Sequence, residues 1–182
     1  MKFVPTRIAD VVVVEPQVFG DARGFFMESW EQKKFAAAGI EAHFVQDNHS
    51  ASSQWVLRGL HYQIRAPQGK LVRVVSGEVF DVAVDLRRSS ATFGQWVGEL
   101  LSAANRRMLW IPPGFAHGFL ALSERVDFIY KCTNYYDQAS ERALLWNDPQ
   151  VAIDWSLPAG VQPVVSCKDA DAAHFADAEY FS

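Results

Sequence analysis

The strongest indication of the fold is RMLWIPPGFAHGFLAL, Arg107–Leu122. Its apolar and aromatic runs, Arg107–Ile111 and Phe115–Leu122, flank a Pro-Pro-Gly sequence of the kind that forms turns. The stretch therefore predicts two short strands joined by a turn, with His117 on the second strand.

Similar runs, rich in β-branched and aromatic residues and separated by turn residues, continue on both sides of this stretch. The other predicted strands are Val11–Val14, His43–Asn48, Trp55–Gln63, Lys70–Val75, Glu78–Leu86, Gln95–Leu101 and Val126–Cys132. Ser76 and Gly77 separate two of them and predict a tight hairpin. Many short strands at this spacing are typical of a sandwich or a barrel.

One helix is predicted, over Ser29–Gly39. Ser29 and Gln32 form the capping-box pattern, and Gly39 is a residue type that commonly follows a helix. No repeat, low-complexity segment or linker divides the chain, so residues 1–182 are expected to form one domain. A less regular tail is expected from about residue 138, folding back over the barrel.

Composition limits the partners and the location. The 182 residues are 49% hydrophobic and 13% aromatic, which suffices for a real core. A net charge of −4 argues against general affinity for nucleic acid or for an anionic membrane. We find no apolar run long enough for a signal peptide or a membrane span, and Cys132 and Cys167 fit neither a metal knuckle nor a disulfide framework. A cytoplasmic protein with reduced thiols is expected.

Arg58 and His61 lie three residues apart on a predicted strand, so a regular pleat would send their side chains to opposite faces. Gly59 between them is a residue that often marks a bulge, and one extra residue there would turn both side chains toward the same cavity. The alternative is a core histidine beside a surface arginine.

The Pro112–His117 segment fits the P-x-G-x-x-H pattern of the second cupin motif, in which a strand enters a jelly-roll barrel with its histidine pointing inward. The fold class predicted is therefore mainly β, a cupin-type jelly-roll barrel with few short helices. Metal-binding cupins supply H-x-H and a nearby glutamate from the first motif, whereas this chain has His61-Tyr62-Gln63 and no carboxylate in the following Ile64–Gly69. Two histidines make a poor metal site, so no metal is predicted.

Histidines in a barrel without a metal can still remove a proton from carbon next to a carbonyl. His61 is the candidate base, with Asp169 as its orienting partner if the tail folds back. Tyr130 could return a proton on the opposite face, and Lys70 could stabilise the enolate. The alternatives are a solvated loop acid for Asp169, a core aromatic for Tyr130 and an edge-strand lysine for Lys70.

Arginines and aromatic residues suggest where a nucleotide diphosphate would bind. Arg23 and Arg58 are the best-placed cations for phosphate oxygens. The segment Phe19–Phe26 carries three phenylalanines, and these, like Tyr135 or Tyr136, could sandwich a base, although loop aromatics also simply pack.

Taken together, these motifs resemble the dTDP-4-dehydrorhamnose 3,5-epimerase family of cupin-fold enzymes. The resemblance covers nearly the whole chain, from about residue 2 to Asp169. The matching stretches are Phe19–Glu28, Phe44–Ser50, Leu57–Gln63, Gln68–Arg73, Trp110–Phe119 and Thr133–Tyr136.

The resemblance implies a reaction, which is epimerisation of dTDP-4-keto-6-deoxy-D-glucose at C3 and C5 to dTDP-4-keto-L-rhamnose without a cofactor. It also implies that His61 is the base, paired with Asp169, and that Tyr130 is the acid. Family members are homodimers that exchange N-terminal segments. The positions matching substrate contacts are Phe19, Arg23, Phe26, Glu28, Gln46, Asp47, Asn48, Arg58, Lys70, His117, Tyr136, Glu141 and Lys168.

Three alternatives stay open at the level of sequence. A sister enzyme on the same scaffold could epimerise only C3 or only C5, or isomerise the keto group. A metal-dependent cupin oxygenase is disfavoured by the missing third ligand. A sugar-nucleotide sensor would bind the ligand without exchanging protons with it, and fold alone does not separate these options.

Overall fold

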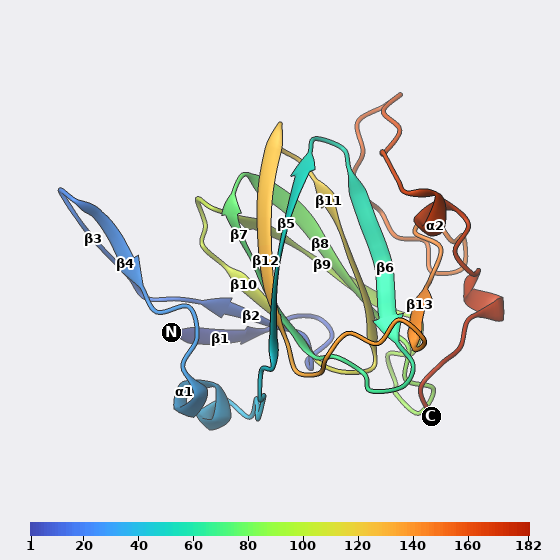
Figure 1. Ribbon diagram of the computed structural model, residues 1–182, viewed down its shortest axis with the longest axis horizontal. Helices are drawn as coiled ribbons and strands as arrows, with labels where there is room; N and C mark the ends of the chain where they lie inside the picture. Colours follow the sequence, from blue (N-terminus) through green and yellow to red (C-terminus); the bar gives the residue numbers. More distant parts are fainter.

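The computed structural model describes residues 1–182 and shows two antiparallel sheets that face each other (Figure 1). The six-stranded sheet has the order β1 (Lys2–Pro5), β2 (Val12–Glu15), β10 (Met108–Ile111), β7 (Lys70–Ser76), β12 (Arg125–Cys132) and β5 (Gln46–Ser53). The five-stranded sheet has the order β13 (Glu141–Ala143), β6 (Leu57–Gln63), β11 (Phe115–Ala121), β8 (Glu78–Asp85) and β9 (Trp96–Ser102). The predicted mainly β, jelly-roll-type fold is confirmed.

The main core lies between the two sheets. Sixteen buried residues form it, among them Val72 and Phe128 from the six-stranded sheet and Val79 and Phe119 from the five-stranded sheet. Alternate side chains of a contributing strand enter this layer, as Leu109 and Ile111 of β10 do, because the pleat turns every second side chain to the same face. Complete burial of one such side chain stabilises the folded state by roughly 1.5–3 kcal/mol relative to leaving it exposed.

The outer faces of both sheets are covered by the rest of the chain. Helix α1 (Gln32–Ala37) places Phe35 against Trp110 on the outside of the six-stranded sheet. The tail packs Leu144 and Trp155 against the outside of the five-stranded sheet. The short helix α2 (Cys167–Ala170) of the tail therefore lies beside β6 (Figure 1). A 3₁₀ turn, η1 (Phe175–Asp177), follows, and no helix is long and apolar enough to cross a membrane.

The predicted hairpin at Ser76-Gly77 is wrong, because β7 and β8 belong to different sheets. Gly77 has a φ of 79°, and a Cβ there would lie 2.3 Å from the carbonyl oxygen of Arg125. The glycine thus makes a corner at which the chain crosses from one sheet to the other.

The predicted capping box of α1 is also wrong. Helix α1 begins three residues after Ser29, and the carboxylate of Glu31 accepts the backbone N–H groups of Lys33 and Lys34. A carboxylate satisfies two free N–H groups here, which a single hydroxyl could not do. The end of the helix is as expected, with Gly39 at a φ of 82° just after it.

Two strands that the sequence patterns do not predict, β3 (Val18–Asp21) and β4 (Gly24–Met27), pair only with each other. This β3–β4 hairpin projects away from the two sheets (Figure 1). Its Phe25 ring is contacted by the Arg106 guanidinium, 4.3 Å from the ring centroid. Phe19, Phe25 and Phe26 are all more than half exposed, which is unusual for three aromatic side chains on one short element.

Candidate active site

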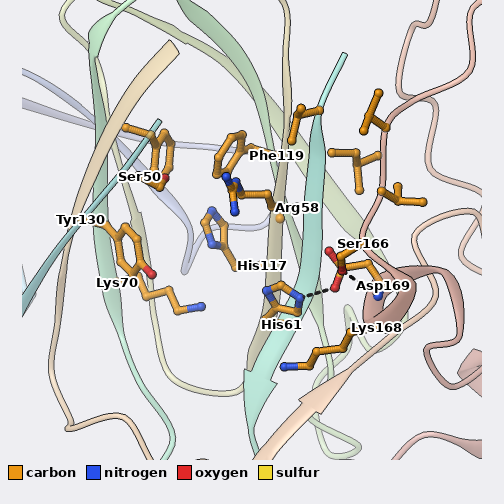
Figure 2. Close-up of a pocket in the computed structure, with 16 residues that line it drawn as sticks. Ser50, Arg58, His61, Lys70, His117, Phe119, Tyr130, Ser166, Lys168 and Asp169 are labelled. Carbon is orange, nitrogen blue, oxygen red and sulfur yellow. Dashed lines mark hydrogen bonds and ion pairs between the residues drawn. The ribbon is translucent and has the colours of Figure 1, made fainter. Parts of the chain in front are cut away.

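A cavity of about 450 Å³ opens between the sheets (Figure 2). Its walls come from β6 and β11 on one side, from β7 and β12 on the other, and from the tail segment 164–169. A second cavity of about 250 Å³ shares His61, Lys70 and Tyr130 with the first. These three residues therefore stand where the two cavities meet.

The predicted bulge at Gly59 is present. Arg58 pairs with Phe119 and His61 pairs with His117, so two residues of β6 oppose only Gly118 of β11. Close approach of the two backbones leaves no room for a side chain at position 59, where a Cβ would lie 2.5 Å from the Cα of Gly118. Arg58 and His61 consequently line the same cavity (Figure 2).

His61 and Asp169 form a hydrogen-bonded pair at the cavity wall. The His61 Nε2 to Asp169 Oδ1 distance is 2.6 Å, and Asp169 also accepts the backbone N–H of Gly59. Ser166 caps α2 and accepts the backbone N–H of Asp169, which fixes that residue in place. Asp169 is only 3% exposed, so it is not the solvated loop acid of the alternative interpretation.

The ionisation of Asp169 determines which His61 nitrogen can act. Burial alone would raise the pKa of Asp169, but the hydrogen bond and charge of His61, with the Gly59 N–H, lower it below its usual value. The carboxylate is therefore ionised and accepts a hydrogen from Nε2, which leaves the lone pair of a neutral ring on Nδ1. Nδ1 has no partner within the protein and is free to accept a proton.

Tyr130 and Lys70 lie on the opposite wall from His61 (Figure 2). Tyr130 lies on β12 in step with the core residue Phe128, and its hydroxyl makes no hydrogen bond within the protein. Burial raises the pKa of Tyr130, so its phenol keeps its proton at neutral pH. Lys70 begins the interior strand β7, which excludes an edge-strand role, and burial lowers its pKa.

His117 faces the same cavity from β11 and is almost completely buried. Its Nε2 lies 2.9 Å from Oδ2 of Asp81, a fully buried carboxyl group on β8. The ring also stacks on Phe128, with 6.2 Å between centroids. His117 is thus a second histidine held by a buried acid.

Five of the predicted substrate contacts lie around the mouth of the two cavities. Glu141 joins two of them, because its carboxylate lies 2.5 Å from the Lys168 ammonium and accepts the Tyr136 hydroxyl at 2.9 Å. Gln46 and Asn48 are hydrogen-bonded to each other and line the smaller cavity. All five offer polar atoms to a ligand there.

Arg58 extends across the first cavity (Figure 2). Its Nε donates to the hydroxyl of Ser52, and one terminal nitrogen donates to the carbonyl of Ala51. The other terminal nitrogen remains available for an anionic ligand.

The structure does not bring every predicted contact to the cavities. Phe19, Arg23 and Phe26 lie on the projecting β3–β4 hairpin, where Arg23 pairs with Asp21 of the same hairpin. Glu28 follows the hairpin and pairs with Lys34 of α1. Asp47 points to the outer face of β5 and pairs with Lys131, because alternation on the strand turns it away from Gln46 and Asn48.

Several residues of the site were not found from the sequence. Asp81, the partner of His117, interrupts the otherwise apolar run Val79–Val84, and an acidic residue in such a run was the available signal. Ser166 precedes Asp169 in an S-x-x-D pattern that is typical of a helix start. Ser50 and Phe119 carried no signal that distinguishes them from other strand residues.

The chain contains no cluster of three or more His, Cys, Asp and Glu residues that could hold a metal ion. His61 and His117 each direct Nε2 to a carboxyl group instead. The donor set of a metal-binding cupin therefore does not fit these residues.

The protein is thus a jelly-roll barrel with acid–base side chains on both walls of one cavity. A family model described as dTDP-4-dehydrorhamnose 3,5-epimerase matches residues 5–177. The dTDP-4-dehydrorhamnose 3,5-epimerase of Pseudomonas aeruginosa is 58% identical over 100% of this chain and 99% of its own. This chain belongs to the dTDP-4-dehydrorhamnose 3,5-epimerase family.

Solved structures agree with this assignment. The 3,5-epimerase of Legionella pneumophila, in complex with dTDP-4-keto-L-rhamnose, is 55% identical with a TM-score of 0.90, covering 94% of this chain and 90% of its own. A more distant neighbour, a 3'-monoepimerase from Streptomyces bikiniensis in complex with dTDP-quinovose, is 30% identical with a TM-score of 0.87, covering 95% and 87%.

Proposed function

We propose that the protein inverts C3 and C5 of dTDP-4-keto-6-deoxy-D-glucose to give dTDP-4-keto-L-rhamnose. The observation that carries the proposal is the arrangement of His61, oriented by Asp169 at 2.6 Å, across a cavity from the protonated Tyr130. Inversion needs a proton acceptor on one face of a carbon and a proton donor on the other, and these two groups supply them.

The reaction at each carbon proceeds by enolisation. His61 Nδ1 takes the proton from the carbon next to the ketone. The electron pair of that C–H bond forms a C=C bond, and the π electron pair of the C=O bond moves onto the ketone oxygen. Lys70 and His117 stabilise the negative oxygen, while Asp169 stabilises the imidazolium of His61. Tyr130 then gives its proton to the opposite face of the carbon as the C=O bond re-forms. His61 afterwards releases its extra proton to water, and Tyr130 takes up a proton from water. These side chains supply every proton and charge, so the proposed reaction needs no metal and no cofactor.

The nucleotide and the diphosphate are assigned to the cavity mouth. Gln46 and Asn48 offer amide groups to the base and the ribose, and the exposed ring of Tyr136 offers a stacking surface. Lys168 and Arg58 supply positive charge for the diphosphate. Lys168 is already bound to Glu141, so a phosphate would share or replace that partner.

The proposal includes a homodimer, because four expected contacts lie away from the two cavities of their own subunit. Phe19, Arg23 and Phe26 project on the β3–β4 hairpin, where both phenylalanine rings are exposed, and Glu28 follows the hairpin. A second copy of the chain would place this hairpin at the mouth of its partner's cavity and bury those rings.

The proposal also places the enzyme in the cytoplasm. Cys132 and Cys167 are both unpaired, which fits a reducing compartment.

A second candidate is a single-centre epimerase, since the S. bikiniensis neighbour described as a 3'-monoepimerase shares this fold. The same base and acid could serve one carbon or two in turn. The shape of the cavity around the sugar decides whether one carbon or two are inverted. The higher sequence identity to the 3,5-epimerases favours inversion of two carbons.

Proton NMR of the substrate in D₂O tests the proposal, using chelator-treated enzyme and the variant His61→Ala. Deuterium should enter both C3 and C5 with the wild type and neither with the variant. Exchange at one carbon alone would indicate the single-centre enzyme. Binding with no exchange at all would contradict an epimerase and favour a sugar-nucleotide sensor.

A further inference from the structure

Asp81 is a buried acid that the mechanism above does not use. It lies on β8, opposite Phe119 of β11, and its side chain has no exposure to solvent. Both carboxyl oxygens lie within hydrogen-bonding distance of His117 Nε2, at 3.1 and 2.9 Å. No other side chain is hydrogen-bonded to Asp81, so the whole carboxyl group serves one imidazole.

The contacts of His117 leave only one edge of its ring free. Asp81 holds Nε2, and Phe128 stacks on the ring with an interplanar angle of 22°. Nδ1 has no partner within the protein, although the side chain lines the cavity between Lys70 and His61 (Figure 2). A fixed ring with one unpaired nitrogen beside a cavity is what a preorganised hydrogen-bond donor requires.

Resting on the function proposed above, we propose that Asp81 is a positioning residue. It holds the His117 ring by Nε2 and keeps a hydrogen on Nδ1, so that the imidazole donates a hydrogen bond to the ketone oxygen of the substrate.

The protonation of the pair follows from its burial. Burial lowers the pKa of His117 and raises the pKa of Asp81. A pair with a net positive charge and a pair with a net negative charge are therefore both disfavoured. Two neutral arrangements exist, an imidazolium with a carboxylate or an imidazole with a carboxylic acid. They differ only in the position of one proton in the Nε2–Oδ2 hydrogen bond, and both carry a hydrogen on Nδ1.

Other charges near the pair act on it from separate elements. Lys70 on β7 and His61 on β6 both favour the neutral form of His117, whereas Lys70 favours the ionised form of Asp81. As the ketone oxygen gains negative charge, the proton can move from Asp81 onto the ring, which strengthens the donor at Nδ1 without a change in the charge of the pair.

The test combines kinetics with ¹⁵N NMR of the intact enzyme. Loss of a buried partner that orients a functional imidazole typically costs about 10- to 100-fold, so we expect Asp81→Ala to lower kcat by that factor and to change KM less than about 3-fold. Asp81→Asn, which can still bond Nε2, should recover part of kcat. Asp85→Asn on the same strand is the matched control, because Asp85 is equally buried but is bonded to Arg87 away from the cavity.

Two further measurements separate positioning from a merely structural role. In a His117→Ala background, Asp81→Ala should cause no further loss of kcat, whereas an additive loss would overturn the proposal. The ¹⁵N shift of His117 Nδ1 in the wild type should report a protonated nitrogen at neutral pH. An unprotonated Nδ1 would overturn the proposal even if the Asp81 variants failed to fold. A wild type that exchanged no deuterium would instead refute the proposed function. The ¹⁵N shift of His117 does not depend on that function, so the two failures can be told apart.

Discussion

The carboxylate of Asp169 reaches His61 from 108 positions further along the chain. Asp169→Asn keeps the shape of the side chain but cannot stabilise an imidazolium, and its amide can bind the wrong tautomer of His61. We expect kcat to fall by about 10²- to 10⁴-fold with little change in KM, as measured by steady-state kinetics. Asp171→Asn, two residues away at the end of α2, is the control and should keep wild-type kcat.

At the level of residues, the sequence predicted the acid–base candidates and the partner of His61, but not the partner of His117. His61, Tyr130, Lys70 and Asp169 were all identified, and the structure brings them to one cavity. Asp81 was missed, because it lies opposite Phe119, and its reach to His117 two residues away depends on the register of β8 and β11, which sequence patterns do not determine.

Among the elements, the bulge of β6 determines where His61 points. A Cβ at Gly59 would lie 2.5 Å from the Cα of Gly118, and the φ of 134° favours glycine. We expect Gly59→Ala to lower stability by at least about 2 kcal/mol, because backbone atoms cannot yield as side chains can. Thermal unfolding should show this as a loss of at least about 4 °C.

The matched control for this prediction is Gly160→Ala. Gly160 also has a positive φ, of 82°, but a Cβ there would meet nothing within 4 Å. A loss as large in Gly160→Ala as in Gly59→Ala would show that backbone strain, and not the approach of β11, dominates.

The turn after β8 makes stability depend on pH. Burial alone would raise the pKa of Asp85, but hydrogen bonds from Arg87, Ser90 and Thr92 hold it at about 2. The folded-state pKa is thus below the unfolded value, so this contribution, about 2 kcal/mol, is present above about pH 4 and is lost as the pH falls toward 2.

Urea unfolding between pH 2 and pH 7 measures that contribution. The wild type should lose stability over this acidic range, and Asp85→Asn should be less stable at pH 7 with a flatter dependence between pH 4 and pH 2. Parallel curves for the two proteins would contradict the assignment to Asp85.

The strands with strong apolar runs were predicted within one or two residues, as for β7, β8, β11 and β12. The polar strand β5 (Gln46–Ser53) was placed too early, because its sequence QDNHSASS lacks apolar alternation. It forms nonetheless as the partner of β12. Pairing with a neighbour overrides weak local preference in such a strand.

For the whole molecule, the β3–β4 hairpin predicts that each active site is built from two subunits. His61→Ala and Arg23→Ala should each be poorly active alone. In a hybrid dimer of the two, one site receives both defects and the other receives none, so about half of the wild-type activity per dimer should return. Co-expression with two affinity tags isolates the hybrid, and no recovery would show that the hairpin acts within its own subunit.

Such an assembly is also the level at which sequence patterns are least informative. The tail was expected to fold back over the barrel, but sequence patterns predicted neither that its Leu144 and Trp155 pack on the five-stranded sheet nor that the hairpin projects. Both depend on contacts between segments far apart in the chain, or in different chains, and no local pattern records these contacts.

In the proposed mechanism, acid and base act from opposite walls of one cavity, and Tyr130→Phe is the sharpest test of this arrangement. The product of this variant is followed by NMR in D₂O, which reports deuterium uptake and configuration at C3 and C5 together. We predict that His61 still exchanges a proton on its own face, while inversion falls by at least about 10²-fold. Inversion at the wild-type rate would contradict the account, since the proton on the second face would then come from another group.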